Sequence, residues 1–315
     1  MQNGKAYILG IGAQIIWAGS VIFSKDALTL FTPLTIVSMR FVLSVAFMLL
    51  IGSLVAHFRP SSALALGRID RSDIPLFVLA GFLQPFLYFV FEIFAIKLIS
   101  SPTMAEAVLS TNPLFSPLFA YVLSHEKIRL NNIAGILISS AGVAVILLVG
   151  NKDFSIGSVW GVVFAFLAVF SAVTYSTLLR RVPAKYNNLT WVCYVQMFGL
   201  VFFLPTWGVI DARSVVASVD DILSSPLLHN ALIDMLYIGV LASVCAFVMF
   251  CYTIRELGVT RANVFNNFAP VFTALMMLVF YDERLPLIKW AGIAVVIVGL
   301  CICQMNVSEI RKKRR

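Results

Sequence analysis

The sequence predicts an all-α integral membrane protein with ten transmembrane helices arranged as two inverted five-helix repeats. Of its 315 residues, 60% are hydrophobic and only 12% are charged, and the mean hydropathy is +0.95. This composition leaves too little polar surface for a soluble fold, so we place the chain in a lipid bilayer. A duplicated pattern of proline, glutamate and glycine divides the chain into two halves.

The duplication consists of two stretches with the same spacing. Each contains an apolar helix with a proline, a charged turn, and a second apolar helix with two glycines. The landmarks are Pro113, Glu126, Gly135 and Gly142 in the first stretch and Pro270, Glu283, Gly292 and Gly299 in the second. The differences 270−113, 283−126, 292−135 and 299−142 all equal 157. We therefore expect residues 1–150 and 151–315 to be two five-helix repeats.

Apolar runs define the first five helices, since about 20 residues cross a hydrocarbon core of about 30 Å. The run after residues 1–5 is long enough to span, contains Gln14 and Trp17, and lacks a convincing small-residue cleavage site. It is therefore predicted to be a retained helix rather than a signal peptide. The expected ranges are 6–24, 31–55, 74–97, 102–123 and 130–149. Prolines within the third and fourth ranges predict kinks.

The second half repeats this organisation. Its expected helices are 156–179, 189–210, 229–252, 259–281 and 287–305. The two longest connections, 56–73 and 211–228, follow the second helix of each half. The paired glycines of the fifth and tenth helices predict close helix packing. We expect helices one to four and six to nine to surround a central cavity, with helices five and ten at the periphery.

The distribution of Lys and Arg predicts that both termini are cytoplasmic. With that orientation the inner segments contain sixteen of these residues: Lys5, Arg59, Arg68, Arg71, Lys127, Arg129, Arg180, Arg181, Lys185, Arg255, Arg261, Arg311, Lys312, Lys313, Arg314 and Arg315. The outer segments contain six: Lys25, Lys97, Lys152, Arg213, Arg284 and Lys289. The net charge of +8 is therefore a topology signal and an attraction to anionic lipid, and it does not indicate nucleic-acid binding. An odd number of helices per half requires the second half to be inverted.

Three features together resemble a known family. They are the stretch from Trp17 to Lys25 (WAGSVIFSK), the stretch from Pro33 to Arg40 (PLTIVSMR), and the duplicated proline, glutamate and glycine pattern. In this order they are similar to the EamA-type transporters of the drug/metabolite transporter superfamily. The resemblance implies ten helices and movement of metabolites, often outward, without implying one substrate. The second half departs from the pattern: Phe170 stands where a tryptophan is often seen, and Gln196 stands opposite Arg40.

Ionisable and polar residues within the predicted helices are the first candidates for a substrate or ion site, because such residues are costly in lipid. Arg40 lies in the second helix, and the expected topology puts it at a similar depth to two glutamates. The candidates on the third and fourth helices, spaced four residues apart along each, are Gln84, Tyr88, Glu92, Glu106 and Ser110. The alternative interpretation is a structural ion pair, or glutamates that reach the headgroups from the helix ends.

Uncharged side chains supply the remaining candidates. Asn263 and Asn267 lie in the ninth helix, and the offset of 157 matches them with Glu106 and Ser110. Amide groups can recognise a polar ligand through both donors and acceptors, although hydrogen bonds between helices are the ordinary alternative. On the first and sixth helices the candidates are Gln14, Trp17, Ser20 and Tyr175. These side chains line a cavity or pack in the core.

No pattern typical of a catalytic, cofactor or metal site occurs. The five cysteines lie within apolar spans, and the three histidines are scattered at helix ends or loops. We therefore expect no enzyme activity, cofactor or metal. We expect instead a secondary transporter that exports amino acids or related polar or amphipathic metabolites across the cytoplasmic (inner) membrane by alternating access. The expected partners are a small-molecule substrate, lipid and a coupling proton or counter-substrate, with the chain a monomer or homodimer. The alternative is a membrane-embedded enzyme or assembly partner on the same scaffold.

Overall fold

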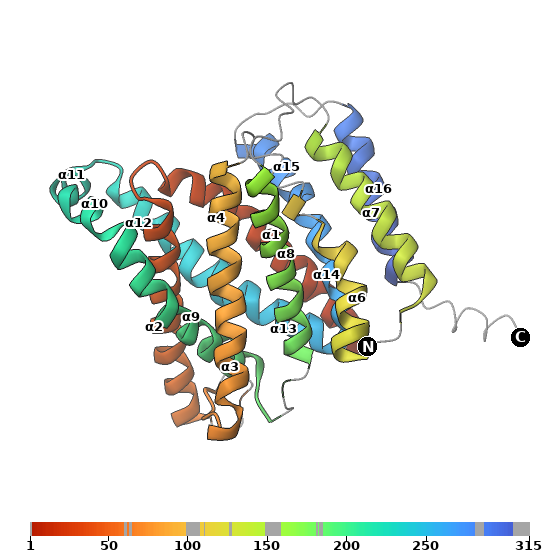
Figure 1. Cartoon of the computed structure of the whole chain (residues 1–315), viewed down its shortest axis with the longest axis horizontal. Helices are drawn as coiled ribbons and strands as arrows, with labels where there is room; N and C mark the ends of the chain where they lie inside the picture. The colour runs from red at the N-terminus through yellow and green to blue at the C-terminus, as the bar shows by residue number, and fades with distance from the viewer. Residues whose placement is uncertain are drawn as a thin grey trace, which may run out of the picture.

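The structure is a computed structural model of the chain, and it is all-helical in the part that it describes (Figure 1). The described residues are 2–59, 62, 65–98, 108–109, 111–125, 128–148, 159–180, 182, 185–280 and 287–304. Every regular element within these ranges is a helix, so the predicted all-α class is confirmed. Two predicted site residues, Glu106 and Ser110, lie outside the described residues, and so do Glu126 and Glu283 of the repeat pattern.

The helices of the first half follow the predicted ranges where these are described. The third predicted helix is a succession of three helical segments, with a π-helical turn, η2, between two α-helices. The elements are α1 (Gln2–Ala27), α2 (Pro33–Phe58), the short η1 (Arg71–Asp73), α3 (Ile74–Gly81), η2 (Phe82–Leu87), α4 (Tyr88–Leu98), α6 (Asn112–Ser124) and α7 (Leu130–Leu148). Thr32 caps α2 by accepting a hydrogen bond from the Thr35 backbone N–H, and Pro33 occupies the first helical turn, where its missing N–H costs nothing.

The second half has the same order, with two additions. Its elements are α8 (Val159–Arg180), α9 (Asn188–Ile210), α10 (Ala212–Ala217), α11 (Val219–Ser224), α12 (Leu228–Leu236), the π-helical η3 (Tyr237–Cys245), α13 (Ala246–Leu257), α14 (Val259–Asn263), η4 (Val264–Asn267), α15 (Phe268–Phe280) and α16 (Leu287–Gln304). The connection 211–228 contains the short helices α10 and α11. The range 259–281, predicted as one helix, is interrupted by the 3₁₀ segment η4.

In the part of the chain that the structure describes, six helical stretches are long and apolar enough to cross a membrane. They are Gly4–Ser24, Pro33–Phe58, Arg71–Glu92, Val159–Arg180, Asn188–Ile210 and Leu228–Leu257. Large apolar side chains on them are exposed, such as Val209 at 84%, and a lipid environment accounts for such exposure. These stretches indicate a multi-pass membrane protein, whereas the full count of ten spans stays a prediction.

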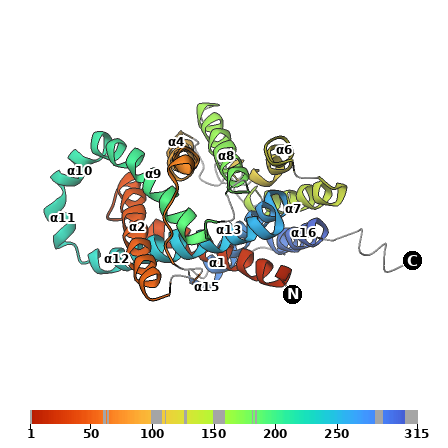
Figure 2. The same ribbon diagram turned by 90° about the horizontal axis from the view of Figure 1, so that it is seen from below.

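The helices α7 and α16 pack closely against each other at one end of the molecule, opposite α10 and α11 (Figures 1 and 2). A Cβ added at Gly142 would lie 2.7 Å from the Gly292 oxygen, and one added at Gly299 would lie 2.7 Å from the Gly135 oxygen. Only glycine leaves room for this approach. Close packing predicted from the glycines is thus confirmed, and the partner of each helix is its counterpart in the other half.

The two halves also pack across each other. In the first half, α1 and α2 contact η3, and in the second half α8 and α9 contact η2. The offset of 157 carries residues 82–87 of η2 onto 239–244, which lie within η3. Each half therefore has a π-helical segment at the same place in its third helix, and that segment packs against the first two helices of the opposite half.

Candidate functional site

Arg40 lies at the contact between α2 and η3, and it is only 8% exposed. Its Nε donates a hydrogen bond of 2.6 Å to the Ser243 hydroxyl. The guanidinium carbon lies 5.0 Å from the ring centroid of Phe89 and 5.5 Å from that of Phe41, which are cation–π distances. A buried cation is thus held by one hydrogen bond and two aromatic rings.

Ser243 connects Arg40 to Gln196 of the second half. The Gln196 side chain donates from Nε2 to the Ser243 carbonyl at 2.6 Å, and it accepts a hydrogen bond from the Ser44 hydroxyl. Ser243 itself donates to the carbonyl of Ile238, five residues earlier, a spacing characteristic of a π-helix. We call Arg40, Ser44, Gln196 and Ser243 the Arg40 network, which joins α2, α9 and η3.

Glu92 lies near the Arg40 network on α4. Tyr88 donates a hydrogen bond of 2.9 Å to the Glu92 carboxylate, and both residues are close enough to act electrostatically on the Arg40 guanidinium. The carboxylate is not within salt-bridge distance of Arg40, so these two described side chains are neighbours rather than a direct pair. Glu106, the third member of the predicted charge cluster, lies outside the described residues.

Both π-helical segments receive a hydrogen bond from the first helix of the opposite half. The Trp17 indole of α1 donates to the carbonyl of Ala242 in η3 at 3.0 Å, and Ser171 of α8 donates to the carbonyl of Leu83 in η2 at 2.6 Å. A π-helical turn leaves carbonyl groups without their usual α-helical partner, and these side chains satisfy two of them. The backbone of Gln84 within η2 is not helical (φ −144°, ψ 118°).

The other candidates on α1 lie beside Trp17. Gln14 is 1% exposed and donates to the Asn266 side chain at 3.1 Å. Ser20 donates to the carbonyl of Trp17. Gln14 therefore joins α1 to η4, whereas the Ser20 hydroxyl is bonded within its own helix.

The remaining candidates lie in packed surroundings. The Asn263 amide donates to Ser116 at 2.8 Å, and the Asn267 amide donates to Ser139 at 2.7 Å. The Oδ1 atom of Asn267 is buried without a partner among the described residues. Tyr175 is 4% exposed and accepts a hydrogen bond from the Trp191 indole at 3.1 Å. These three contacts have the form of helix-to-helix hydrogen bonds, the alternative that the sequence left open.

A polar cluster joins the two halves at one end of the bundle. Lys185 lies 2.8 Å from the Asp73 carboxylate and also pairs with Asp70. Tyr186 donates to Asp73 at 2.6 Å, and its carbonyl accepts from Arg255 at 2.6 Å. Hydrogen bonds to the two carboxylates raise the pKa of Lys185, and the bond to Asp70 has the larger effect. We call these five residues the Lys185 cluster.

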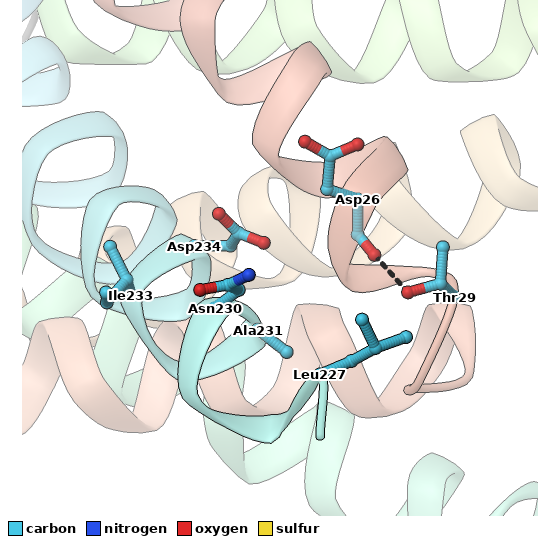
Figure 3. A pocket seen from close by; sticks show the side chains of 7 residues that line it. All are labelled: Asp26, Thr29, Leu227, Asn230, Ala231, Ile233 and Asp234. Carbon is cyan, nitrogen blue, oxygen red and sulfur yellow. Dashed lines mark hydrogen bonds between the residues drawn. The ribbon is translucent and has the colours of Figure 1, made fainter. Parts of the chain in front are cut away.

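A pocket of about 400 Å³ lies between the C-terminal end of α1 and α12 (Figure 3). Its lining residues are Asp26, Thr29, Leu227, Asn230, Ala231, Ile233 and Asp234. None of them was a predicted site residue. The sequence could have indicated Asp234, because it is an acid within the apolar run ALIDMLYIGV. An ionisable residue in such a run indicates a functional site.

Comparisons with known proteins agree with one another. The profile described as the EamA-like transporter family matches residues 4–148 and again 159–304. A protein of Archaeoglobus fulgidus named an uncharacterized transporter is 25% identical to this chain, and the match covers 95% of this chain and 97% of that protein. A probable terminal-alkyne amino-acid exporter of Streptantibioticus cattleyicolor is 27% identical over 66% of each chain. A crystal structure with 19% identity covers 95% of this chain and 98% of its own with a TM-score of 0.75, which shows a shared fold.

Proposed function

The chain belongs to the EamA-like transporter family, and from this premise we propose that it is a secondary transporter of amino acids or related small metabolites. Transport proceeds by alternating access, with export as the direction, across the cytoplasmic membrane. The related amino-acid exporter supports the substrate class. Family membership also favours a transporter over the membrane-embedded enzyme considered from the sequence.

The observation that carries this proposal is the Arg40 network. It puts a buried cation and three buried polar side chains at the contact between the halves, where apolar residues would pack at lower cost. In inverted-repeat transporters the substrate site lies at the interface of the repeats, near discontinuous helices. The adjoining π-helical segments η2 and η3 are such discontinuities. The proposed site is centred on Arg40. It also includes Trp17, which bonds to η3, Gln84 of η2, and Glu92, which acts electrostatically on Arg40.

The proposed topology has ten spans, five in each of the halves 1–150 and 151–315, with both termini cytoplasmic. Two sets of contacts support it. The Lys185 cluster joins segments that this topology puts on the inner side, and Thr32 donates a hydrogen bond to Asp211 between two segments that it puts on the outer side. The Lys185 cluster and the hydrogen bond from Thr32 to Asp211 therefore join the two halves at opposite ends of the bundle.

Flux into proteoliposomes tests the function and the site together. The wild type is expected to transport members of a panel of amino acids and related metabolites. Arg40→Gln is expected to lower that flux at least about tenfold, because a hydrogen bond to a charged group contributes about 1.5–3 kcal/mol and about 1.4 kcal/mol corresponds to a factor of ten. Arg213→Gln, which removes a cation from α10, is the matched control and should retain the wild-type rate.

The outcomes separate the two claims. Absence of flux for the whole panel with folded wild-type protein contradicts the proposed transporter function for these substrates. Wild-type flux in folded Arg40→Gln protein leaves the function standing but removes Arg40 from the site.

A further inference from the structure

The pocket between α1 and α12 contains a buried acid that the proposed transport site does not use. Asp234 is 8% exposed, and its carboxylate has no hydrogen-bond or ion-pair partner among the described residues. Figure 3 shows its side chain directed into the space between the two helices. A carboxylate on so largely buried a residue, with no described protein partner, is stabilised by a cation in the pocket, because the pairing offsets the cost of its partial desolvation.

The other polar groups of the pocket are also suited to a cation. Asp26 lies across the pocket on α1, and its negative charge acts on Asp234. Thr29 and Asn230 add a hydroxyl and an amide oxygen on the two sides. No basic side chain is among the described residues that line the pocket. The described lining therefore offers oxygen acceptors from both halves of the chain.

Size and ligand count indicate an organic cation rather than a metal ion. The volume of about 400 Å³ falls within the range of small-molecule sites, roughly 300–1,000 Å³, and far exceeds the space of one ion. Within the described ranges, no group of three or more His, Cys, Asp or Glu side chains is arranged to hold a metal. Leu227 and Ile233 supply apolar walls that suit an alkyl chain.

We propose that this pocket binds a primary ammonium group, with Asp234 as its counter-ion and Asp26, Thr29 and Asn230 as further acceptors. An ammonium has three donors, which matches several oxygen acceptors around one site. Two sources supply this chemistry: a soluble alkylamine, and the ethanolamine headgroup of a phospholipid. The proposal does not depend on the proposed transport function, because it concerns binding at a separate pocket.

Thermal unfolding of the full chain in nanodiscs tests both sources. In the first arm, phosphatidylcholine nanodiscs receive n-butylammonium chloride, with sodium chloride and n-butanol as controls for ionic strength and for the alkyl chain. In the second arm, the nanodiscs contain phosphatidylethanolamine and no added amine. We expect the unfolding midpoint to rise in at least one arm and not with either control. Asp234→Asn should weaken the apparent affinity about tenfold, because it removes the charge that accepts the ammonium.

Matched variants keep the test decisive. Asp220→Asn removes an exposed acid from α11 outside the pocket and should retain the full response. If Asp234→Asn does not fold, Asp26→Asn and Asn230→Ala alter the exposed rim and should each weaken the response. The proposal is overturned if neither arm raises the wild-type midpoint, if sodium acts as strongly as butylammonium, or if the pocket variants respond as the wild type does.

Discussion

At the scale of single residues, the cost of burying Arg40 is the main constraint on the site. An arginine within a membrane helix costs about 2.5–3.5 kcal/mol on insertion scales. The Ser243 hydroxyl and the faces of Phe41 and Phe89 offset part of that cost without neutralising the charge. Glu92 is a described acid that acts electrostatically on the guanidinium without forming a direct salt bridge with it. Substitution of Glu92 therefore tests what this acid contributes to transport.

Glu92→Gln tests whether this acid takes part in coupling. If Glu92 exchanges a proton during transport, the variant should lose the pH dependence that the wild-type flux shows, because glutamine cannot bind or release that proton. The measurement is proteoliposome flux against pH, with Asp220→Asn as control and Glu106→Gln assayed in parallel. Wild-type rates and pH dependence in both glutamate variants would make the acids structural.

At the scale of elements, glycine decides where helices meet most closely. Gly142 of α7 faces the backbone of α16, whereas a Cβ at Gly208 of α9 would meet no atom within 4 Å. Both glycines lie inside helices, so an alanine at either position gains the same intrinsic helix propensity, about 1 kcal/mol. The difference between them isolates the contribution of packing between α7 and α16.

Gly142→Ala is therefore expected to destabilise the protein, and Gly208→Ala to leave it unchanged or slightly more stable. Overpacking typically costs about 1–3 kcal/mol, which outweighs the gain in helix propensity when the obstructing atoms are backbone. The midpoints of thermal unfolding of the two variants in the same detergent provide the comparison. Equal midpoints would show that α7 and α16 separate at little cost.

At the scale of the whole molecule, sequence patterns predicted those features that hydropathy and spacing encode. The apolar runs located α1, α2, α8 and α9 to within a few residues, and the glycine spacing predicted close packing of α7 and α16 without identifying each as the partner of the other. The π-helical segments were not predictable in this way, because a change from i→i+4 to i→i+5 bonding leaves composition unaltered. Partners distant in sequence, such as Ser243 for Arg40 and Ser116 for Asn263, depend on packing that periodicity does not specify.

The two ends of the bundle carry different polar contacts, and the topology assigns them to opposite sides of the membrane. The Lys185 cluster is on the end assigned to the cytoplasm, and the pocket with Thr29 is on the other. The pKa of Lys185 is raised, so its stabilising contribution is complete below the ordinary lysine pKa of about 10.4 and is lost only as pH rises through the higher folded value. The cluster is therefore fully charged throughout a labelling experiment near neutral pH.

New cysteines at Lys185 and Thr29, each introduced into a background with the exposed Cys301 replaced by serine, should react from opposite sides. A membrane-impermeant maleimide is expected to label Thr29→Cys in intact cells and Lys185→Cys only in inside-out vesicles. The excess of sixteen basic residues over six gives the direction of this asymmetry. The Cys301→Ser background without a new cysteine is the control for the other four thiols. Labelling with the sides exchanged would invert the topology, and labelling of both positions from one side would contradict the proposed inverted arrangement of the halves.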